Sequence, residues 1–242
     1  CAFNKIKIMK IALLGYGKMG KAIEKIALKR NHKIVFLLDK NIKKGKLSNA
    51  DVAINFSVPD SAYDNVMMAL ELKIPVVSGT TGWLKFYDKI KKYCLENNSS
   101  FLYSSNFSIG VNLFFKINQY LAKLINNYNE YKVKIDEIHH VNKLDKPSGT
   151  AISIAEDIIS NSAYKNWKLN DFNDSNNSIL IDSIRKDDTP GTHNITYSSK
   201  IDKIKISHIA KSREGFAFGA IIAAEWLKNK KGVFNMNDVL DL

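Results

Sequence analysis

The residues best suited to chemistry lie in one short stretch, Glu137–Ala151, with the sequence EIHHVNKLDKPSGTA. Two adjacent imidazoles, His139 and His140, are followed within a few residues by the amine of Lys143. Histidine titrates near neutral pH, and a positioned histidine or lysine can transfer a proton to or from a reacting group. The stretch therefore offers positive charge and proton-transfer groups to an acidic small molecule.

The same stretch ends in Ser148-Gly149-Thr150, which we expect to open a helix from Ala151 to about Ser160. The first N–H groups of a helix have no partner within it, and the helix dipole favours negative charge there. We therefore expect the amides of this turn to bind an anion. The simpler alternative is that this sequence only caps the helix.

The histidine pair is a poor metal site by itself. Adjacent residues of a strand point to opposite faces, so His139 and His140 could not hold one ion without a turn between them. The chain has two cysteines, Cys1 and Cys94, which are too few for a disulfide framework or a metal cluster. We therefore expect no metal, an inert Cys94 inside a helix, and a reducing, cytoplasmic location.

A glycine motif near the start of the chain predicts a dinucleotide site. It follows the apolar strand Lys10–Leu14 and precedes a helix that we expect to end near Lys29, which is the context this motif requires. Gly15 permits the tight turn, Gly17 lets the backbone approach a pyrophosphate, and Gly20 lets helix and strand pack closely. The residues of the motif are Gly15, Tyr16, Gly17, Lys18, Met19 and Gly20.

The second strand indicates which dinucleotide binds. Lys33–Leu38 ends at Asp39, about 20 residues past the glycines, where an acid accepts hydrogen bonds from the ribose hydroxyls of NAD. Lys40 follows and could instead attract the 2′-phosphate of NADP. The pair predicts that both NADH and NADPH are accepted.

Strands and helices continue to alternate, which predicts a doubly wound parallel sheet. Further strands are expected at Val52–Phe56, Ile74–Ser78 and Phe101–Ser104, and further helices at Ser61–Leu72 and Trp83–Asn97. Such a sheet binds its ligand at the carboxyl ends of the strands. The loops there are predicted to contact the dinucleotide through Gly79, Thr80, Thr81, Ser104, Ser105, Asn106 and Phe107, with Ser57 at the same edge. For Gly79–Thr81 the alternative is a simple strand-to-helix turn.

The pattern changes after Gly110. We expect a long helix at Val111–Tyr128, a strand at Tyr131–Ile138, a polar loop at Asn161–Asn177, and an apolar helix at Phe216–Lys230 that packs on the first domain. Three runs with period-two alternation suggest a half-buried antiparallel sheet: Ile179–Arg185, His193–Ser198 and Lys203–Ile209.

The predicted fold class is α/β. A Rossmann-type doubly wound parallel sheet is formed by 9–108 and completed by 213–242, and an inserted α+β domain, 109–212, carries a mixed or antiparallel sheet. Residues 1–8 are interpreted as an extension. We expect the two domains to close by hinges near Ser105–Gly110 and Ser212–Gly215.

Composition argues against two classes of partner. The formal charge is +12, but the lysines are spread along the whole chain, so we expect no nucleic-acid binding. No apolar run approaches the ~18 residues that cross a bilayer, so we expect no membrane. Arginine occurs only at Arg30, Arg185 and Arg213, and the sequence leaves open whether the last two contact substrate or another subunit.

Taken together, these motifs resemble those of the 4-hydroxy-tetrahydrodipicolinate reductase (dihydrodipicolinate reductase) family of diaminopimelate and lysine biosynthesis. The 137–151 stretch carries the resemblance, which extends through 79–82, 105–112, 190–193, Arg213 and 216–220. The resemblance implies NADH- or NADPH-dependent reduction of a cyclic dicarboxylate by a homotetramer.

The resemblance also implies individual roles. His139 would donate or accept a proton, and Lys143 would donate one near the reacting carbon–nitrogen system. His140 and the turn at Ser148, through the amides of Gly149 and Thr150, would hold the substrate carboxylates. One alternative is another Rossmann oxidoreductase, such as an aspartate-semialdehyde or homoserine dehydrogenase-like enzyme, although the former needs a nucleophilic cysteine in a loop, which is lacking here. The other alternative is a dinucleotide-sensing protein without catalysis.

Overall fold

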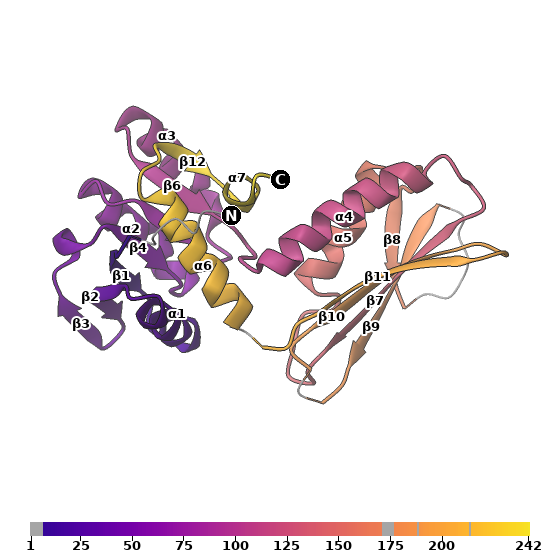
Figure 1. The fold of residues 1–242 in the computed structure, drawn as a ribbon, viewed down its shortest axis with the longest axis horizontal. Coiled ribbons are helices and arrows are strands. Elements are labelled where there is room, and N and C mark those ends of the chain that lie inside the picture. Colours follow the sequence, from indigo (N-terminus) through magenta and orange to yellow (C-terminus); the bar gives the residue numbers. More distant parts are fainter. Residues whose placement is uncertain (1–6, 171–176, 188, 213) are drawn as a thin grey trace. The chain divides into compact units, whose positions relative to one another are not determined.

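The computed structural model describes residues 7–170, 177–187, 189–212 and 214–242 (Figure 1). Most of the predicted extension and Arg213 therefore lie outside the described residues. The chain divides into two compact units. Unit 1 combines the residues up to Ile109 with Glu214–Leu242, and unit 2 is Gly110–Arg213.

Unit 1 is built on a seven-stranded sheet with the order β12-β6-β5-β4-β1-β2-β3. Its strands are β1 (Lys10–Leu14), β2 (Lys33–Asp39), β3 (Ile42–Gly45), β4 (Val52–Asn55), β5 (Val76–Ser78), β6 (Ser100–Tyr103) and β12 (Gly232–Phe234). All neighbours pair in parallel except β3, which is antiparallel to β2. The predicted Rossmann-type doubly wound sheet is confirmed.

Helices cover both faces of this sheet. They are α1 (Lys18–Lys29), α2 (Pro59–Glu71), α3 (Tyr87–Glu96), α6 (Glu214–Leu227) and α7 (Met236–Leu240), with short 3-10 turns at Leu47–Asn49 and Leu84–Phe86. Strand β1 shows why two layers form, because its side chains alternate between two cores. Ile11 and Leu13 pack with α1 and α6, whereas Ala12 and Leu14 pack with α2 and α3. None of the helices among the described residues is long and apolar enough to span a membrane.

Several boundaries in unit 1 differ from the prediction. The helix expected from Trp83 begins at Tyr87, because Trp83 is buried and its indole donates a 2.7 Å hydrogen bond to the Thr80 carbonyl. Strands β3 and β12 and helix α7 were not predicted, since they have only three to five residues each and too little periodicity to be seen. Cys94 is buried in α3 as predicted, and burial raises the pKa of its thiol to about 11.

Unit 2 contains a five-stranded sheet of order β11-β10-β7-β9-β8 with two helices on one face. Its elements are α4 (Ile109–Ile125), β7 (Lys132–His139), α5 (Gly149–Ser160), β8 (Asn166–Leu169), β9 (Ser178–Arg185), β10 (Thr192–Ser198) and β11 (Lys203–Ile209). The core lies between the sheet and the helices, where Ile135, Ile181 and Ile195 pack with Ile154 and Ile158.

The sheet of unit 2 is mixed, so the predicted inserted domain with a mixed or antiparallel sheet is confirmed. β10 is antiparallel to β7 and β11, but β9 is parallel to β7, so the antiparallel pairing suggested by the alternation of Ile179–Arg185 was wrong. Strands β8 and β9 both run parallel to β7 because the chain returns over the sheet through α5 before β8. The loop expected at Asn161–Asn177 was also wrong in part, because β8 lies inside it and pairs with β9. Residues 171–176 of that segment are outside the described residues.

Glu225 on α6 ties that helix to the end of α1. Arg30 donates two hydrogen bonds of 2.8 Å to its carboxylate, and His32 Nε2 lies 2.8 Å from Oε1. Burial raises the pKa of Glu225, but the hydrogen bonds from Arg30 and His32 outweigh this effect and hold that pKa below its ordinary value. The ionised carboxylate therefore stabilises the folded state.

We expect Glu225→Gln to lower the free energy of unfolding at pH 7 by about 2 kcal/mol. This is less than the destabilisation that follows when one partner of a fully buried ion pair is removed. A carboxyl group whose pKa is lowered by folding stabilises the folded state at pH values above its unfolded-state pKa of about 4.3. This contribution is lost as the pH falls through the folded-state pKa. In urea unfolding, the difference from wild type should therefore shrink from pH 5 to about pH 3. The control is Glu214→Gln. Glu214 lies on α6, as Glu225 does, but its ion pair with Lys25 of α1 is exposed, so this substitution should change stability little. A difference that stays constant with pH would contradict this account.

Candidate functional site

The alternation of strand β7 brings two of its polar residues to the inner face. Val133, Ile135, Glu137 and His139 are buried along this face, whereas the residues between them are half-buried on the other. Glu137 is fully buried, and His139 is 8% exposed at the end of the strand. A buried carboxylate is costly unless it is hydrogen-bonded, so the surroundings of Glu137 decide what this site can do.

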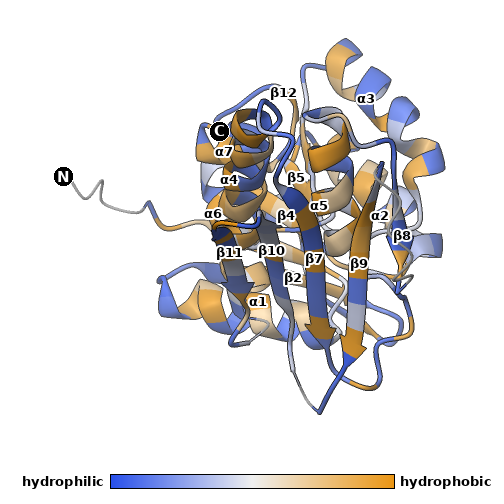
Figure 2. Cartoon of the chain, turned by 90° about the vertical axis from the view of Figure 1, so that its right-hand side faces the viewer, coloured by the Kyte–Doolittle hydropathy of each residue, from blue (hydrophilic) through white to orange (hydrophobic). Residues whose placement is uncertain are grey.

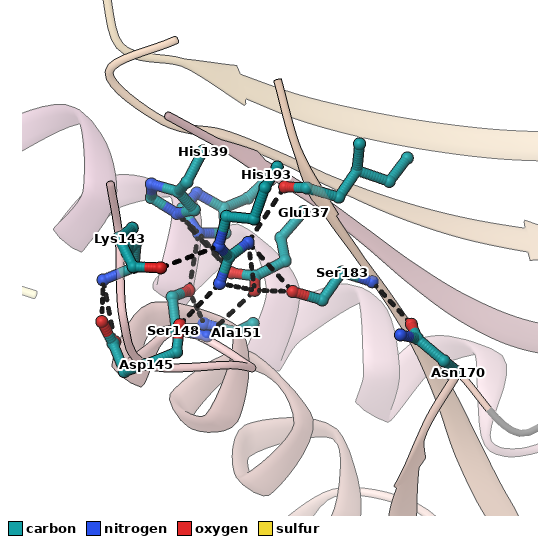
Figure 3. Close-up of polar contacts among 11 residues, drawn as sticks. Glu137, His139, Lys143, Asp145, Ser148, Ala151, Asn170, Ser183 and His193 are labelled. Carbon is teal, nitrogen blue, oxygen red and sulfur yellow. Dashed lines mark hydrogen bonds and ion pairs between the residues drawn. The ribbon is translucent and has the colours of Figure 1, made fainter. Parts of the chain in front are cut away.

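One oxygen of Glu137 is held by several donors (Figure 3). Oε1 accepts hydrogen bonds from the amide of Ser148 (3.0 Å) and the hydroxyl of Ser183 (2.5 Å), and the guanidinium of Arg185 lies 3.4 Å away. Burial raises the pKa of Glu137, but the hydrogen bonds from Ser148 and Ser183 outweigh it, and the pKa lies below its usual value. Glu137 is therefore an anion at neutral pH.

The second oxygen of Glu137 faces two imidazoles. Oε2 lies 3.5 Å from His139 Nε2 and 3.7 Å from His193 Nε2, and the two nitrogens are 3.3 Å apart. We call Glu137, His139 and His193 the Glu-His-His cluster (Figure 3). Burial lowers the pKa of His139 and lowers that of His193 to about 3. Both rings are therefore neutral at neutral pH, and the ring of His193 also lies 3.2 Å from the hydroxyl of Ser148.

Lys143 lies in the loop after β7, fixed by two neighbours. Its ammonium is 2.7 and 2.8 Å from the two carboxylate oxygens of Asp145. Arg185 donates to the carbonyls of Lys143 (3.4 Å) and Asp145 (2.5 Å). Burial is the main cause that lowers the pKa of His139, and the charge of Lys143 lowers it further. Within unit 2, Arg185 thus positions the loop that carries Lys143.

The turn at the start of α5 was predicted to bind an anion or, more simply, to cap the helix. The hydroxyl of Ser148 accepts a hydrogen bond from the amide of Ala151 (3.2 Å), so Ser148 does cap the helix. Gly149 is exposed, and a Cβ added there would meet no described atom within 4 Å. Thr150 and His140 are half-buried. The backbone at Gly149 is therefore open on the side that a Cβ would occupy.

In unit 1 the glycine motif forms a tight turn. Gly15 has φ +97°, and its amide donates to the carbonyl of Leu38 (2.7 Å). A Cβ at Gly20 would lie 2.4 Å from the carbonyl oxygen of Gly15, whereas a Cβ at Gly17 would meet no described atom within 4 Å. The carboxylate of Asp39 accepts hydrogen bonds from the amides of Tyr16 (2.9 Å) and of Lys40, its own neighbour in the chain (2.7 Å).

Hydrogen bonds join the loops that follow β4, β5 and β6. The side chain of Asn55 donates to the hydroxyl of Ser78 (3.0 Å), Thr80 donates to the Ser57 carbonyl (3.1 Å), and the amide of Ser104 donates to the Ser78 carbonyl (3.2 Å). The remaining predicted contacts differ in exposure. Those with exposed or half-buried side chains are Tyr16, Lys18, Met19, Thr81, Ser105 and Asn106, whereas Phe107 is buried in the core and offers only its backbone.

Sequence analysis missed the roles of Glu137, Ser183 and His193 around His139, and it left open what Arg185 contacts. Glu137 could have been found, because it lies two residues before His139 on a strand and so shares its face. His193 could not, since its place beside Glu137 depends on the register of β10 against β7.

The fold and the glycine turn define the class, a two-unit α/β oxidoreductase whose first unit is a dinucleotide-binding domain of the Rossmann type. Residues 9–107 match the family described as dihydrodipicolinate reductase, N-terminus, and residues 110–240 match dihydrodipicolinate reductase, C-terminus. The chain belongs to the dihydrodipicolinate reductase family.

Relatives agree over nearly the whole chain. A 4-hydroxy-tetrahydrodipicolinate reductase of Christiangramia forsetii is 52% identical over 235 residues, which cover 96% of this chain and 98% of the relative. One from Buchnera aphidicola subsp. Schizaphis graminum is 34% identical over 98% of both chains. A dipicolinate-bound dihydrodipicolinate reductase from Paenisporosarcina sp. TG-14 has the same fold, with a TM-score of 0.76 over 96% of this chain and 99% of its own at 21% identity.

Proposed function

We propose that this chain reduces 4-hydroxy-tetrahydrodipicolinate (dihydrodipicolinate) to tetrahydrodipicolinate with NADH or NADPH, in diaminopimelate and lysine biosynthesis. The observation that carries the proposal is 52% identity to a reductase of this name over 96% of the chain. The chain is an NAD(P)H-dependent oxidoreductase, and the glycine turn of unit 1 fits the cofactor because the backbone at Gly17 is open to approach.

The dinucleotide would be held by the residues predicted for it at the carboxyl edge of the unit 1 sheet. The amides at the start of α1 would take the pyrophosphate. The carboxylate of Asp39, fixed by the amides of Tyr16 and Lys40, would accept from a ribose hydroxyl. Lys40, next to it and exposed, would contact the 2′-phosphate of NADPH. The bound cofactor supplies the hydride.

The substrate would be held in unit 2 by its two carboxylates. A relative of the same fold binds dipicolinate, a ring with two carboxylates. Here the ammonium of Lys143, the imidazole of His140 and the helix-terminal amides of Gly149 and Thr150 lie within one loop. Charge-assisted hydrogen bonds of this kind are roughly twice as strong as neutral ones, so they can fix the ring in place.

The 4-hydroxyl group of the substrate leaves as water, which gives the conjugated ring, and reduction of that ring takes up one hydride and one proton. Because burial keeps the His139 ring neutral, the ammonium of Lys143 is the better proton source at neutral pH. Asp145 holds that ammonium in place through two contacts of 2.7 and 2.8 Å. His139, one side of which faces the Glu-His-His cluster, would pass a proton to the substrate or to Lys143 as turnover requires.

The assembly is expected to be a cytoplasmic homotetramer formed through the sheet of unit 2. One face of this sheet is covered by α4 and α5. The opposite face carries partly exposed apolar residues of β9, Leu180 and Ile184 among them, in the strand that Figure 2 shows as largely hydrophobic. Light scattering should give about four times the chain mass.

A coupled assay tests the proposed reaction. The freshly made condensation product of pyruvate and aspartate semialdehyde is supplied, and oxidation of NADH and NADPH is followed in parallel. We expect substrate-dependent oxidation of both cofactors, because Asp39 and Lys40 serve one each. Binding of NADH without such oxidation would indicate a dinucleotide-sensing protein instead.

A further inference from the structure

The Glu-His-His cluster contains a buried carboxylate oxygen that its hydrogen bonds do not account for. Glu137 Oε2 is fully buried and accepts no hydrogen bond from the part of the chain that the structure describes, although Oε1 of the same carboxylate is fully used. It points at the Nε2 atoms of His139 and His193 from 3.5 and 3.7 Å. Three potential metal-ligand atoms therefore converge on one point in the interior of unit 2.

The spacing of these atoms is that of ligands around a tetrahedral ion. Zinc binds imidazole nitrogen and carboxylate oxygen at about 2.0–2.2 Å, so two such ligands of a tetrahedral site lie ~3.3–3.5 Å apart. The three separations in the cluster are 3.3, 3.5 and 3.7 Å. Little side-chain movement is needed for an ion to touch all three atoms at once.

The position of the His139 ring also suits a metal. The ring packs against Gly191, where an added Cβ would lie 2.9 Å from its Cε1 atom, and its Nε2 lies 3.3 Å from Nε2 of His193. This packing restricts the rotation of a ring that would bind a metal ion.

We propose that Glu137 Oε2, His139 Nε2 and His193 Nε2 form a binding site for one divalent transition-metal ion of the zinc type. Solvent would occupy the fourth position. Two features make the site weaker than a dedicated zinc site. Arg185 and Lys143 place positive charge nearby, and the buried Nδ1 of His193 has no second-shell acceptor among the described residues. The site is therefore suited to reversible binding.

Occupation of this site has a consequence that rests on the proposed function. A metal ion on Nε2 would fix the His139 ring and place positive charge on it, so the ring could no longer take up and release a proton as the proposed function requires. The ion would therefore inhibit the reductase, and a chelator would restore activity. This links the reaction to the free level of zinc-like ions without any change of fold.

The test is direct binding to the full-length, chelator-treated protein. Zn²⁺ is titrated by calorimetry, and Co²⁺ is titrated with the visible absorption typical of tetrahedral cobalt as the readout. We expect one ion per chain in both experiments. We expect His193→Asn to weaken binding by at least about 100-fold, more than second-shell partners usually contribute. A wild-type protein without saturable binding of one ion per chain would overturn the proposal.

The matched control is His140→Asn, which removes an imidazole from the same loop but none from the cluster. It should bind Zn²⁺ as the wild type does, and equal losses in both variants would overturn the site. His139→Asn provides a second ligand variant in case His193→Asn does not fold, which thermal unfolding reports. Binding that requires His193 but leaves turnover unchanged would keep the metal site and contradict the role of His139.

Discussion

Replacing Lys143 with alanine is expected to lower kcat by about 10²–10⁴-fold, the usual contribution of a positioned proton donor. The same range is expected for His139→Ala. In both variants the affinity for NADH should change little, because the residues predicted to bind the dinucleotide all lie in unit 1. Steady-state kinetics with calorimetric titration of NADH would separate these effects.

A second lysine in the same loop supplies the control. Lys146 is exposed, so Lys146→Ala removes one positive charge from the loop without removing the ammonium beside Asp145. We expect it to raise the KM for the substrate modestly and to leave kcat near that of the wild type. Near-normal turnover in both Lys143→Ala and His139→Ala would end the assignment of the loop as the catalytic site.

Alanine substitutions at two glycines of the glycine motif are expected to have different effects on stability and on cofactor binding. Gly17→Ala adds a methyl group that meets no described atom within 4 Å, and Gly17 has φ −75°, which alanine accepts readily. Stability should therefore stay unchanged. The methyl group would occupy the side from which the pyrophosphate approaches, so the Kd for NADH and NADPH should rise about tenfold or more, or ~1.4 kcal/mol.

Gly20→Ala should show the opposite pattern. Its Cβ would lie 2.4 Å from the backbone oxygen of Gly15, so α1 must move away from β1. We expect a loss of about 1–3 kcal/mol in unfolding free energy, as for overpacked positions, with weaker cofactor binding as a secondary effect. Thermal unfolding and calorimetry on both variants make the comparison. If Gly17→Ala bound NADH normally, the pyrophosphate would not lie at this turn.

Much of unit 1 could be predicted because its signals are local. The buried strands β1, β4 and β5 are short, largely apolar runs, and the spacing of the three glycines can be recognised within six residues. Strands such as β3, with the sequence IKKG, carry no apolar pattern and form only because β2 offers an edge. In unit 2 the parallel pairing of β9 with β7 depends on the return of the chain over α5, which period-two alternation does not report.

The candidate site was predicted only as far as residue type reveals it. His139 and Lys143 stand out because they are titratable residues in one loop. Glu137 looks like an ordinary strand residue, and the position of His193 depends on cross-strand register over more than 50 residues of sequence separation. What surrounds a catalytic group, and so decides its charge, is a property of long-range packing.

The discontinuity of unit 1 affects how the protein is made. Ala217, Ala220 and Ile221 on α6 complete the core against β4 and β5, and β12 extends the sheet beside β6. While residues 110–242 are being translated, for roughly 5–30 s at usual rates, the earlier strands have an uncovered apolar face. Unit 2 is continuous in the chain and can finish first. We therefore expect a chaperone at the ribosome to bind the nascent amino-terminal segment. Nonsense mutations that remove the last helices should leave this segment prone to aggregation.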